Sequence, residues 1–410
     1  MILYFEHISK MLNKKVYITL IVFAIFLSGC SSNQKKYLQQ LPDVPENWST
    51  LYSGDNNSRG WINEFNDKVL FDLVREALEN NKDLGVAFEN VKIARARAGS
   101  SLAPLLPSIS IGAAKSQISS TIKNSNDDIE RVYNYRESLT TQLNWEIDIW
   151  GRLSTRSRAS YLNAKAIYND YDAAKLSIVG LTAQAWYLFC ESKLQADLAQ
   201  RNLDTRLRTL ERVENRYQKG IVQSRDLRLA RSEVESRKAD LLNRNKALSE
   251  AARNLEIIIG RYPSSNISAE NLPILPPKPL LGSPENVLKN RPDIKSSEIQ
   301  LEQAGLEVTA ARLAFLPSLN ITAQWSTSEK DWSDAFDPDR LAGNIIANLT
   351  QSIFQGGTRI AQSKITESQM KIILNQYSKT LLNAAREIED AVFAENILCL
   401  LYTSDAADES

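Results

Sequence analysis

Four stretches of the chain alternate between apolar and polar residues, which is the pattern of β-strands with two unlike faces. The clearest predicts a strand at about 133–149, preceded by a first strand at about 107–119. Two later stretches, 319–325 and 345–353, alternate in the same way. The polar positions of the clearest strand share one face: Gln142, Asn144, Glu146 and Asp148.

Such strands have two possible settings. A soluble antiparallel sheet exposes one face to water, whereas a membrane barrel needs about 9–11 residues for each crossing. Four strands cannot close a barrel alone, because about eight is the smallest number known. If the strands cross a bilayer, several chains must share the barrel, and the polar face would line its lumen, with Glu146 and Asp148 there or at the lower mouth. Otherwise these carboxylates are ordinary solvated strand residues.

A long helical hairpin is predicted after the first two strands. Residues 153–218 contain no proline and would extend about 100 Å as one helix. Gly220 is expected to end this helix and Ser224 to cap the next, with Asp226 in its first turn. Apolar residues recur every seven positions in both helices and predict a coiled-coil seam. They are Ala196, Leu203, Leu210 and Tyr217 in the first helix and Leu227, Val234, Leu241, Leu248 and Leu255 in the second.

The sequence repeats itself. A shift of 210 residues places Pro107 on Pro317, and beyond the strands a shift of 206 places Gly151 on Gly357. A gap-free series of matches in one order indicates duplication. We expect each repeat to begin with one helix, at 67–103 and at 284–316.

This duplication sets the domain organisation. In chain order we expect a signal peptide at 1–29, a lipidated extended segment at 30–65, the first repeat at 66–260 with its helical hairpin at 150–260, a linker at 261–285, an incomplete second repeat at 286–397 and a non-native tail at 398–410.

The N-terminus has the pattern of a secretory signal. Lys14 and Lys15 precede an apolar run that is short for a bilayer span, which needs about 20 residues. The run ends in Leu-Ser-Gly-Cys, which resembles the bacterial lipobox and implies diacylglycerol and palmitate on Cys30. Ser31 implies sorting to the outer membrane, because Asp is the residue that mainly retains lipoproteins in the inner membrane. The alternative is an ordinary signal peptide with a chance cysteine, and residues 1–10 fit a mis-called start.

Composition excludes several classes of function. Lys and Arg total 49 and so do Asp and Glu, so the net charge gives no reason to expect nucleic acid as a partner. The one histidine, His7, precedes the signal, and the three cysteines fit no metal-ligand spacing. No nucleophile motif or phosphate-binding loop occurs, so we expect neither an enzyme nor a metal or organic cofactor.

Several motifs together resemble the TolC-like outer-membrane efflux proteins, over most of residues 48–397. The strand-to-helix connector reads Trp-Glu-Ile-Asp-Ile-Trp-Gly-Arg at 145–152, and the turn of the hairpin reads Arg-Tyr-Gln-Lys-Gly at 216–220. The second repeat carries Phe-Leu-Pro-Ser-Leu at 315–319 and Phe-Gln-Gly-Gly at 354–357. The lipobox points to the lipoprotein branch, which serves RND-type multidrug efflux pumps.

The resemblance implies a fold of long α-helical coiled-coil hairpins combined with membrane β-strands. A homotrimer would form a twelve-stranded β-barrel in the outer membrane, continued by an α-helical barrel in the periplasm. An inner-membrane transporter of the RND type and a periplasmic adaptor would complete the system. The chain would then be a passive exit duct for drugs or other small molecules.

The resemblance also implies a role for the tip of the helical hairpin. Gly220, Ser224, Asp226 and Leu227 lie where the family contacts its adaptor and closes its pore. Asp226 matches an acidic position that pairs across neighbouring helices in the closed state. A compatible interpretation is that this carboxylate only favours the helix dipole, by about 0.3–1 kcal/mol.

The end of the chain departs from the family pattern. In the family, the helix that contains residues 384–395 continues to a second tip, but here foreign-looking residues follow. We therefore expect the gate residues of the second tip to be missing from this chain.

Two further classes remain as alternatives. The same fold could serve type I protein secretion or metal-ion efflux. A periplasmic adaptor or structural coiled-coil lipoprotein would also combine a lipobox with a helical hairpin, but it would lack the duplication and the four alternating strands.

Overall fold

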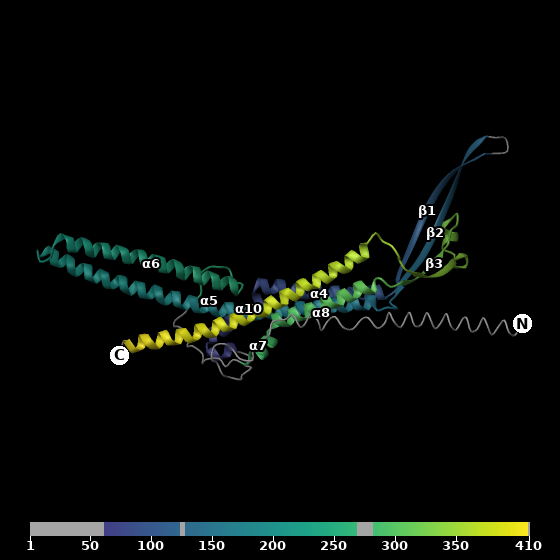
Figure 1. The fold of residues 1–410 in the computed structure, drawn as a ribbon. Coiled ribbons are helices and arrows are strands. Elements are labelled where there is room, and N and C mark those ends of the chain that lie inside the picture. The colour runs from purple at the N-terminus through teal and green to yellow at the C-terminus, as the bar shows by residue number, and fades with distance from the viewer. Residues whose placement is uncertain (1–60, 124–127, 269–281, 409–410) are drawn as a thin grey trace.

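The computed structural model describes residues 61–123, 128–268 and 282–408. Cys30 and Ser31 lie outside these residues, as does most of the expected linker. The described chain is long and thin, with a four-stranded sheet at one end and the turn of a helical hairpin at the other (Figure 1).

The sheet is an antiparallel meander in the order β1-β2-β3-β4. Its strands are β1 (Ser108–Lys123), β2 (Ile129–Ile147), β3 (Ser318–Ser326) and β4 (Ala342–Thr350). The first hairpin is longer than the sequence predicted, because β1 continues four residues past 119 and β2 begins at Ile129. β1 and β2 therefore extend well beyond β3 and β4 (Figure 1).

Two expected strand ends are wrong. β2 stops at Ile147 and β4 stops at Thr350, so Asp148 and Ile353 lie beyond the strands in which we had placed them. Alternation continues into both connectors by sequence alone, but the backbone there leaves the sheet. Gly151 has a φ of 75° and Gly357 a φ of 82°, conformations that favour glycine.

The helical hairpin consists of α5 (Arg152–Gln218) and α6 (Ser224–Ile258). Gly220 ends α5 with a φ of 71°, and the amide of Ile221 donates to the carbonyl of Arg216 at 2.9 Å, a Schellman motif. The expected cap of α6 is wrong by one residue, because Gln223 is the N-cap and Ser224 is already helical. Asp226 lies in the first turn, as expected.

The seven-residue pattern marks the seam between these helices. Ala196, Leu203, Val234 and Leu255 are buried, whereas Tyr217 near the turn is 42% exposed. The seam therefore protects one face of each helix and weakens toward the turn.

The two helices that begin the repeats are each broken, which corrects the expectation of single helices. The pieces are α3 (Lys68–Asn80) with α4 (Lys82–Ser100), and α7 (Pro284–Asn290) with α8 (Pro292–Leu313). Asn81 breaks the first because its side chain accepts from the amide of Leu84 at 2.9 Å and its backbone is extended. Pro292 breaks the second because it lacks an N–H and forces Arg291 into an extended conformation.

The remaining elements complete the second half. A short helix, α9 (Trp332–Ala335), lies between β3 and β4, and α10 (Thr358–Asp408) runs back from the sheet along α8 (Figure 1). In both halves the order is a broken helix, two strands and a long helix. The break falls at residues that differ by 210, Asn81 and Arg291.

The largest buried cluster ties the base of the hairpin to α3. Its buried members are Leu70, Leu73, Val74, Ala77, Ile178, Ala183, Trp186, Phe189, Cys190, Ala251, Ala252, Leu255 and Ile259. Separate clusters join α8 to α10 through Leu301 and Met370, and α7 to α10 through Leu288 and Leu381. Within the described ranges, no helix is both long enough and apolar enough to cross a membrane.

Candidate functional site

The sheet has two chemically distinct faces. Gln142 lies opposite Ser110 on one side and Gln324 on the other. Residues directly opposite in neighbouring strands point to the same face, so the polar positions of all four strands coincide. The neighbouring row is apolar, with Leu143 between Ile109 and Ala323. Where all four strands pair, one face of the sheet is therefore mainly polar and the other mainly apolar.

The apolar row ends part of the way along the first hairpin. Beyond Ala113 and Leu139, the next pair on that face is Lys115 and Glu137, whose side chains form an ion pair of 2.5 Å. The following pair is Gln117 and Tyr135. The apolar band therefore covers the lower part of β1 and β2, and the rest of this hairpin has polar residues on both faces.

The connector from β2 to α5 is held by hydrogen bonds between its side chains and the backbone. Asp148 accepts from the backbone N–H of Leu153 at 2.9 Å and of Ser154 at 2.8 Å, which satisfies two free amides of the first turn of α5. Burial alone would raise the pKa of Asp148, but these hydrogen bonds outweigh it and hold the pKa below the ordinary value. Asp148 is therefore a cap at the helix start and not a strand residue.

The other charged and aromatic residues of this connector also have partners. Glu146 accepts from Arg152 at 2.6 Å. The indole N–H of Trp145 donates to the carbonyl of Leu105 at 3.0 Å, and that of Trp150 donates to the carbonyl of Pro317 at 2.6 Å. The connector thus fixes the angle between the sheet and the helices, a role that the sequence alone did not reveal. Gln142 and Asn144 stay on the polar face of β2 as expected.

The turn between α5 and α6 forms the far end of the molecule (Figure 1). Asp226 and Gln223 form a capping box, in which the Asp226 carboxylate accepts a hydrogen bond from the backbone N–H of Gln223 at 3.2 Å. The Ser224 hydroxyl lies 3.3 Å from the Arg228 guanidinium, and Leu227 is half-buried on the seam. The structure thus brings the four expected tip residues to one turn, and contacts with other chains there stay a prediction.

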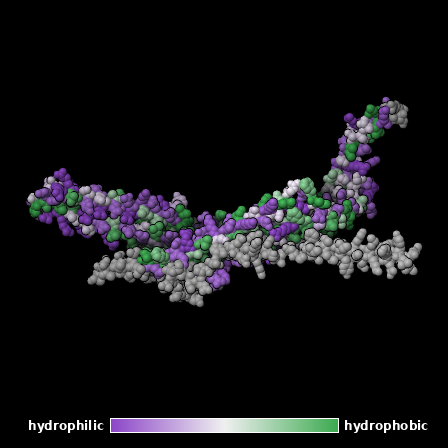
Figure 2. Space-filling view, in the orientation of Figure 1, coloured by the Kyte–Doolittle hydropathy of each residue, from purple (hydrophilic) through white to green (hydrophobic). Residues whose placement is uncertain are grey.

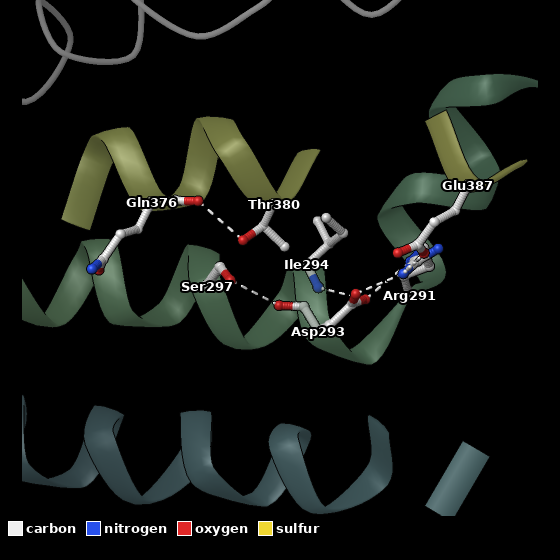
Figure 3. A network of polar contacts seen from close by, with 7 residues as sticks. All are labelled: Arg291, Asp293, Ile294, Ser297, Gln376, Thr380 and Glu387. Carbon is white, nitrogen blue, oxygen red and sulfur yellow. Dashed lines mark hydrogen bonds and ion pairs between the residues drawn. The ribbon is translucent and has the colours of Figure 1, made fainter. Parts of the chain in front are cut away.

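Sequence reasoning missed a polar junction between α7, α8 and α10. The Arg291 guanidinium donates to Asp293 at 2.8 Å and to Glu387 of α10 at 2.9 Å (Figure 3). Burial works against the charge of Asp293, but Arg291 holds the pKa of this carboxyl below its ordinary value. Pro292 inside an expected helix was the one available signal for this corner.

Glu256 is a buried charged residue that the sequence analysis did not single out. It is 1% exposed at the base of the hairpin, and it accepts from the backbone N–H of Ser265 and of Asn266, each at 2.8 Å. Burial would raise its pKa, but these donors lower it overall. Glu256 therefore anchors the segment that leaves the hairpin, which is a structural role.

An open groove of about 820 Å³ lies between α4 and α5, beside the sheet. It is lined by aliphatic and aromatic side chains and by Arg95, Arg158 and Lys165, without a carboxylate. Within the described residues, no three His, Cys, Asp or Glu side chains are grouped as metal ligands. Figure 2 shows apolar surface gathered on the helices next to the sheet and a mainly hydrophilic hairpin.

Comparisons with known proteins agree with this geometry. A family model described as outer membrane efflux protein matches residues 73–261 and 283–398. Cation efflux system protein CusC of Escherichia coli (strain K12) is 28% identical over 379 residues, which cover 90% of this chain and 81% of the relative. Pyoverdine export outer membrane protein OpmQ of Pseudomonas aeruginosa PAO1 is 27% identical over 382 residues, covering 91% and 80%. The solved CmeC outer membrane channel of Campylobacter jejuni superimposes with a TM-score of 0.81 at 25% identity, covering 89% of this chain and 79% of the other.

Proposed function

Because this chain belongs to the outer membrane efflux protein family, we propose that three copies of it assemble into one exit duct. The chain has the TolC-like fold and is the outer-membrane channel component of an efflux system, extending into the periplasm. The trimer, the lipid anchor and the identity of the partners are the parts that we propose.

The observation that carries the trimer is the two-faced sheet with two edges. Within the described chain, β1 pairs only with β2, and β4 pairs only with β3. Four strands cannot close a barrel, and an open edge in lipid would leave backbone N–H and C=O groups without partners. Three chains would supply twelve strands, with the polar faces around the lumen and the apolar faces toward lipid. Gln142, Asn144 and Glu146 would then line the lumen, and Asp148 would lie at its lower rim.

We place the adaptor at the tip of the α5–α6 hairpin. The turn at Gly220, Ser224, Asp226 and Leu227 lies at the opposite end of the molecule from the sheet (Figure 1). A periplasmic adaptor is expected to contact this turn and join it to an inner-membrane transporter of the RND type. The duct itself would be passive, because its energy would come from that transporter.

We propose that Cys30 carries diacylglycerol and palmitate and that Ser31 directs the chain to the outer membrane. Both residues lie outside the described part of the chain, so this proposal rests on the Leu-Ser-Gly-Cys motif. A named relative supports it, because SilC of Salmonella typhimurium, 27% identical, is called a probable outer membrane lipoprotein.

The names of the relatives support a proposal about the class of cargo. The names of the relatives refer to cations, organic solvents and pyoverdine at similar levels of identity. We therefore propose small molecules as the cargo class, and the choice among them belongs to the transporter.

Membrane fractionation followed by gel electrophoresis tests the proposal. The signal-bearing chain, expressed in a Gram-negative host with radiolabelled palmitate, should enter the outer membrane and migrate as a trimer until it is heated. Cys30→Ala should abolish the label, whereas the matched variant Cys190→Ala, at a buried helix position, should keep it. A monomer in the inner membrane would contradict the channel assignment for this chain.

A further inference from the structure

The groove between α4 and α5 opens on the same side of the molecule as the apolar face of the sheet. Leu105 lines the end of the groove next to the sheet, and its carbonyl accepts a hydrogen bond from the indole N–H of Trp145 at 3.0 Å. Trp145 belongs to the apolar row of β2, because it lies two residues from Leu143 and opposite Ile321. The sheet end of the groove therefore adjoins the apolar face.

The periodicity of α5 agrees with this orientation. Arg152, the first residue of α5, binds Glu146, which lies on the polar face of the sheet. At about 100° per residue, Tyr161 and Lys165 of the groove point about half a turn away from Arg152. The groove thus faces away from the polar side and toward the side that the proposed channel turns to lipid.

The apolar row of the first hairpin is too short to match a bilayer on its own. On β1 it runs only from Ile109 to Ala113, because Lys115 is next on that face. Those residues rise about 17 Å along the strand, whereas the apolar band of an outer-membrane barrel is about 25 Å tall. Leu102 and Leu106 follow below the sheet and are 52% and 65% exposed. The sheet end of the groove therefore continues the apolar surface, which Figure 2 shows on the helices next to the sheet.

The far end of the groove is cationic. The Arg95 guanidinium of α4 lies over the Tyr168 ring of α5, 5.7 Å from the ring centroid, and Lys165 lies one turn from Tyr168. No carboxylate lines the groove, and neither Arg95 nor Lys165 forms an ion pair within the part of the chain that the structure describes. These two cations face the groove with their charges unbalanced.

Neighbouring cations outside this end are balanced by acids. Lys92, one turn from Arg95 on α4, has Glu89 at 2.7 Å. Arg158, between the two ends of the groove, lies 3.5 Å from Glu302 of α8. An apolar surface that leads to two unbalanced cations is complementary to an amphipathic anion, because each end of the groove suits one part of such a molecule.

We propose that this groove binds one anionic phospholipid from the periplasmic leaflet of the outer membrane. The phosphate lies between Arg95 and Lys165, and the acyl chains run past Leu102 toward the apolar face of the sheet. The lipid proposed on Cys30 does not suit the cationic end, because diacylglycerol and palmitate carry no charge. The inference goes beyond the proposed function and rests only on its orientation of the sheet toward lipid.

Lipid binding measured by native mass spectrometry tests the inference. The full chain, extracted from outer membranes and freed of lipid in mild detergent, is titrated with phosphatidylglycerol or with zwitterionic phosphatidylcholine of the same acyl chains. We expect one phosphatidylglycerol per chain, bound more tightly than phosphatidylcholine. Arg95→Gln with Lys165→Gln should weaken phosphatidylglycerol binding about 30-fold and remove the preference for it.

Two further variants separate charge from shape. Arg97→Gln with Arg156→Gln is the matched control, because both are exposed residues of the same two helices outside the groove, and it should bind lipid as the parent chain does. Gly99→Leu keeps every charge but places a side chain in the groove, where a Cβ atom would meet nothing within 4 Å. It should fold normally and weaken phosphatidylglycerol binding.

Equal binding of phosphatidylglycerol by the parent chain and by the variant without Arg95 and Lys165 would overturn the inference, as would the absence of a preference over phosphatidylcholine. Binding that occurs only after residues 33–60 are deleted would assign the groove to the N-terminal segment of this chain and would overturn it as well. In each case, a chain that still enters the outer membrane and migrates as a trimer when unheated would leave the proposed function standing.

Discussion

Asp148 links the sheet to the longest helix with one carboxylate. Its hydrogen bonds to the amides of Leu153 and Ser154 keep its pKa below the ordinary value, against the effect of burial. A folded-state pKa below the unfolded one stabilises the fold above the unfolded pKa, and this contribution is lost as pH falls through the folded pKa. We expect Asp148→Ala to lower the free energy of unfolding at pH 7 by about 0.5–2 kcal/mol, as for other helix caps.

Thermal unfolding, followed by circular dichroism at pH 7 and in strong acid, measures this loss of stability and its dependence on pH. The difference in stability between the parent chain and the Asp148→Ala variant should shrink in acid. There the Asp148 carboxylate of the parent chain is protonated, so the parent also loses its charged cap. Asp240→Ala is the control, because that carboxylate makes only an exposed 3.6 Å ion pair with Arg244. A deficit of the same size at both pH values would refute the role of the charge.

Glu256 offers a second test at the scale of one residue. It is buried, and it accepts hydrogen bonds from two backbone amides and from the Ser264 hydroxyl. Charge-assisted hydrogen bonds contribute about 1.5–3 kcal/mol each, so Glu256→Gln should destabilise the fold clearly at neutral pH. Chemical denaturation should show this loss and almost none for Glu250→Gln, an exposed residue on the same helix. Equal midpoints for the two variants would exclude an anchoring role.

Sequence reasoning placed some of the residues of the sheet, the connector and the hairpin base correctly and missed others, and the reasons are physical. Alternation placed Gln142, Asn144 and Glu146 correctly on one face of β2. It failed for Asp148 because a period of two says nothing about where the backbone leaves the sheet. Glu256 follows a seam leucine and resembles any polar helix residue, since its partners lie in a segment that folds back by tertiary contact.

At the scale of elements, the β3–β4 hairpin depends on one glycine. A Cβ atom at Gly343 would collide with the indole of Trp325, its cross-strand neighbour. Overpacking of this kind costs about 1–3 kcal/mol, so Gly343→Ala should loosen the hairpin. Hydrogen–deuterium exchange of peptides covering 342–350 should rise in this variant.

The control for this prediction is Gly112→Ala in β1, where a Cβ atom would meet nothing within 4 Å. Its exchange should match that of the parent chain. Trp325→Leu, combined with Gly343→Ala, should restore protection because it removes the obstructing ring. Unchanged exchange in Gly343→Ala alone would show that the collision is relieved at no cost.

The helices show the same division between what patterns predict and what they miss. The absence of proline from 153–218 and the heptad spacing predicted α5, its partner α6 and their seam. The breaks at Asn81 and Arg291 were missed. In the first case a side chain replaces a helical hydrogen bond, and in the second a proline lies inside an otherwise continuous pattern.

At the scale of the whole molecule, the chain forms two unlike ends joined by helices. The sheet offers a polar and an apolar face with both edges open in the described chain, and the far end is a capped helical turn. The duplication was readable from the sequence because matching residues recur at shifts of 210 and 206. The strand pairing shows the same two shifts, since Ser108 pairs with Asn144 and Ser318 with Thr350.

The most direct measurement of the central claim is the mass of the complex after gentle extraction from outer membranes. Native mass spectrometry should give three times the mass of the processed, lipidated chain, and collisional release should give single chains. A mass equal to one chain, from the same membranes, would contradict a shared barrel and with it the account of the sheet as one third of a channel wall.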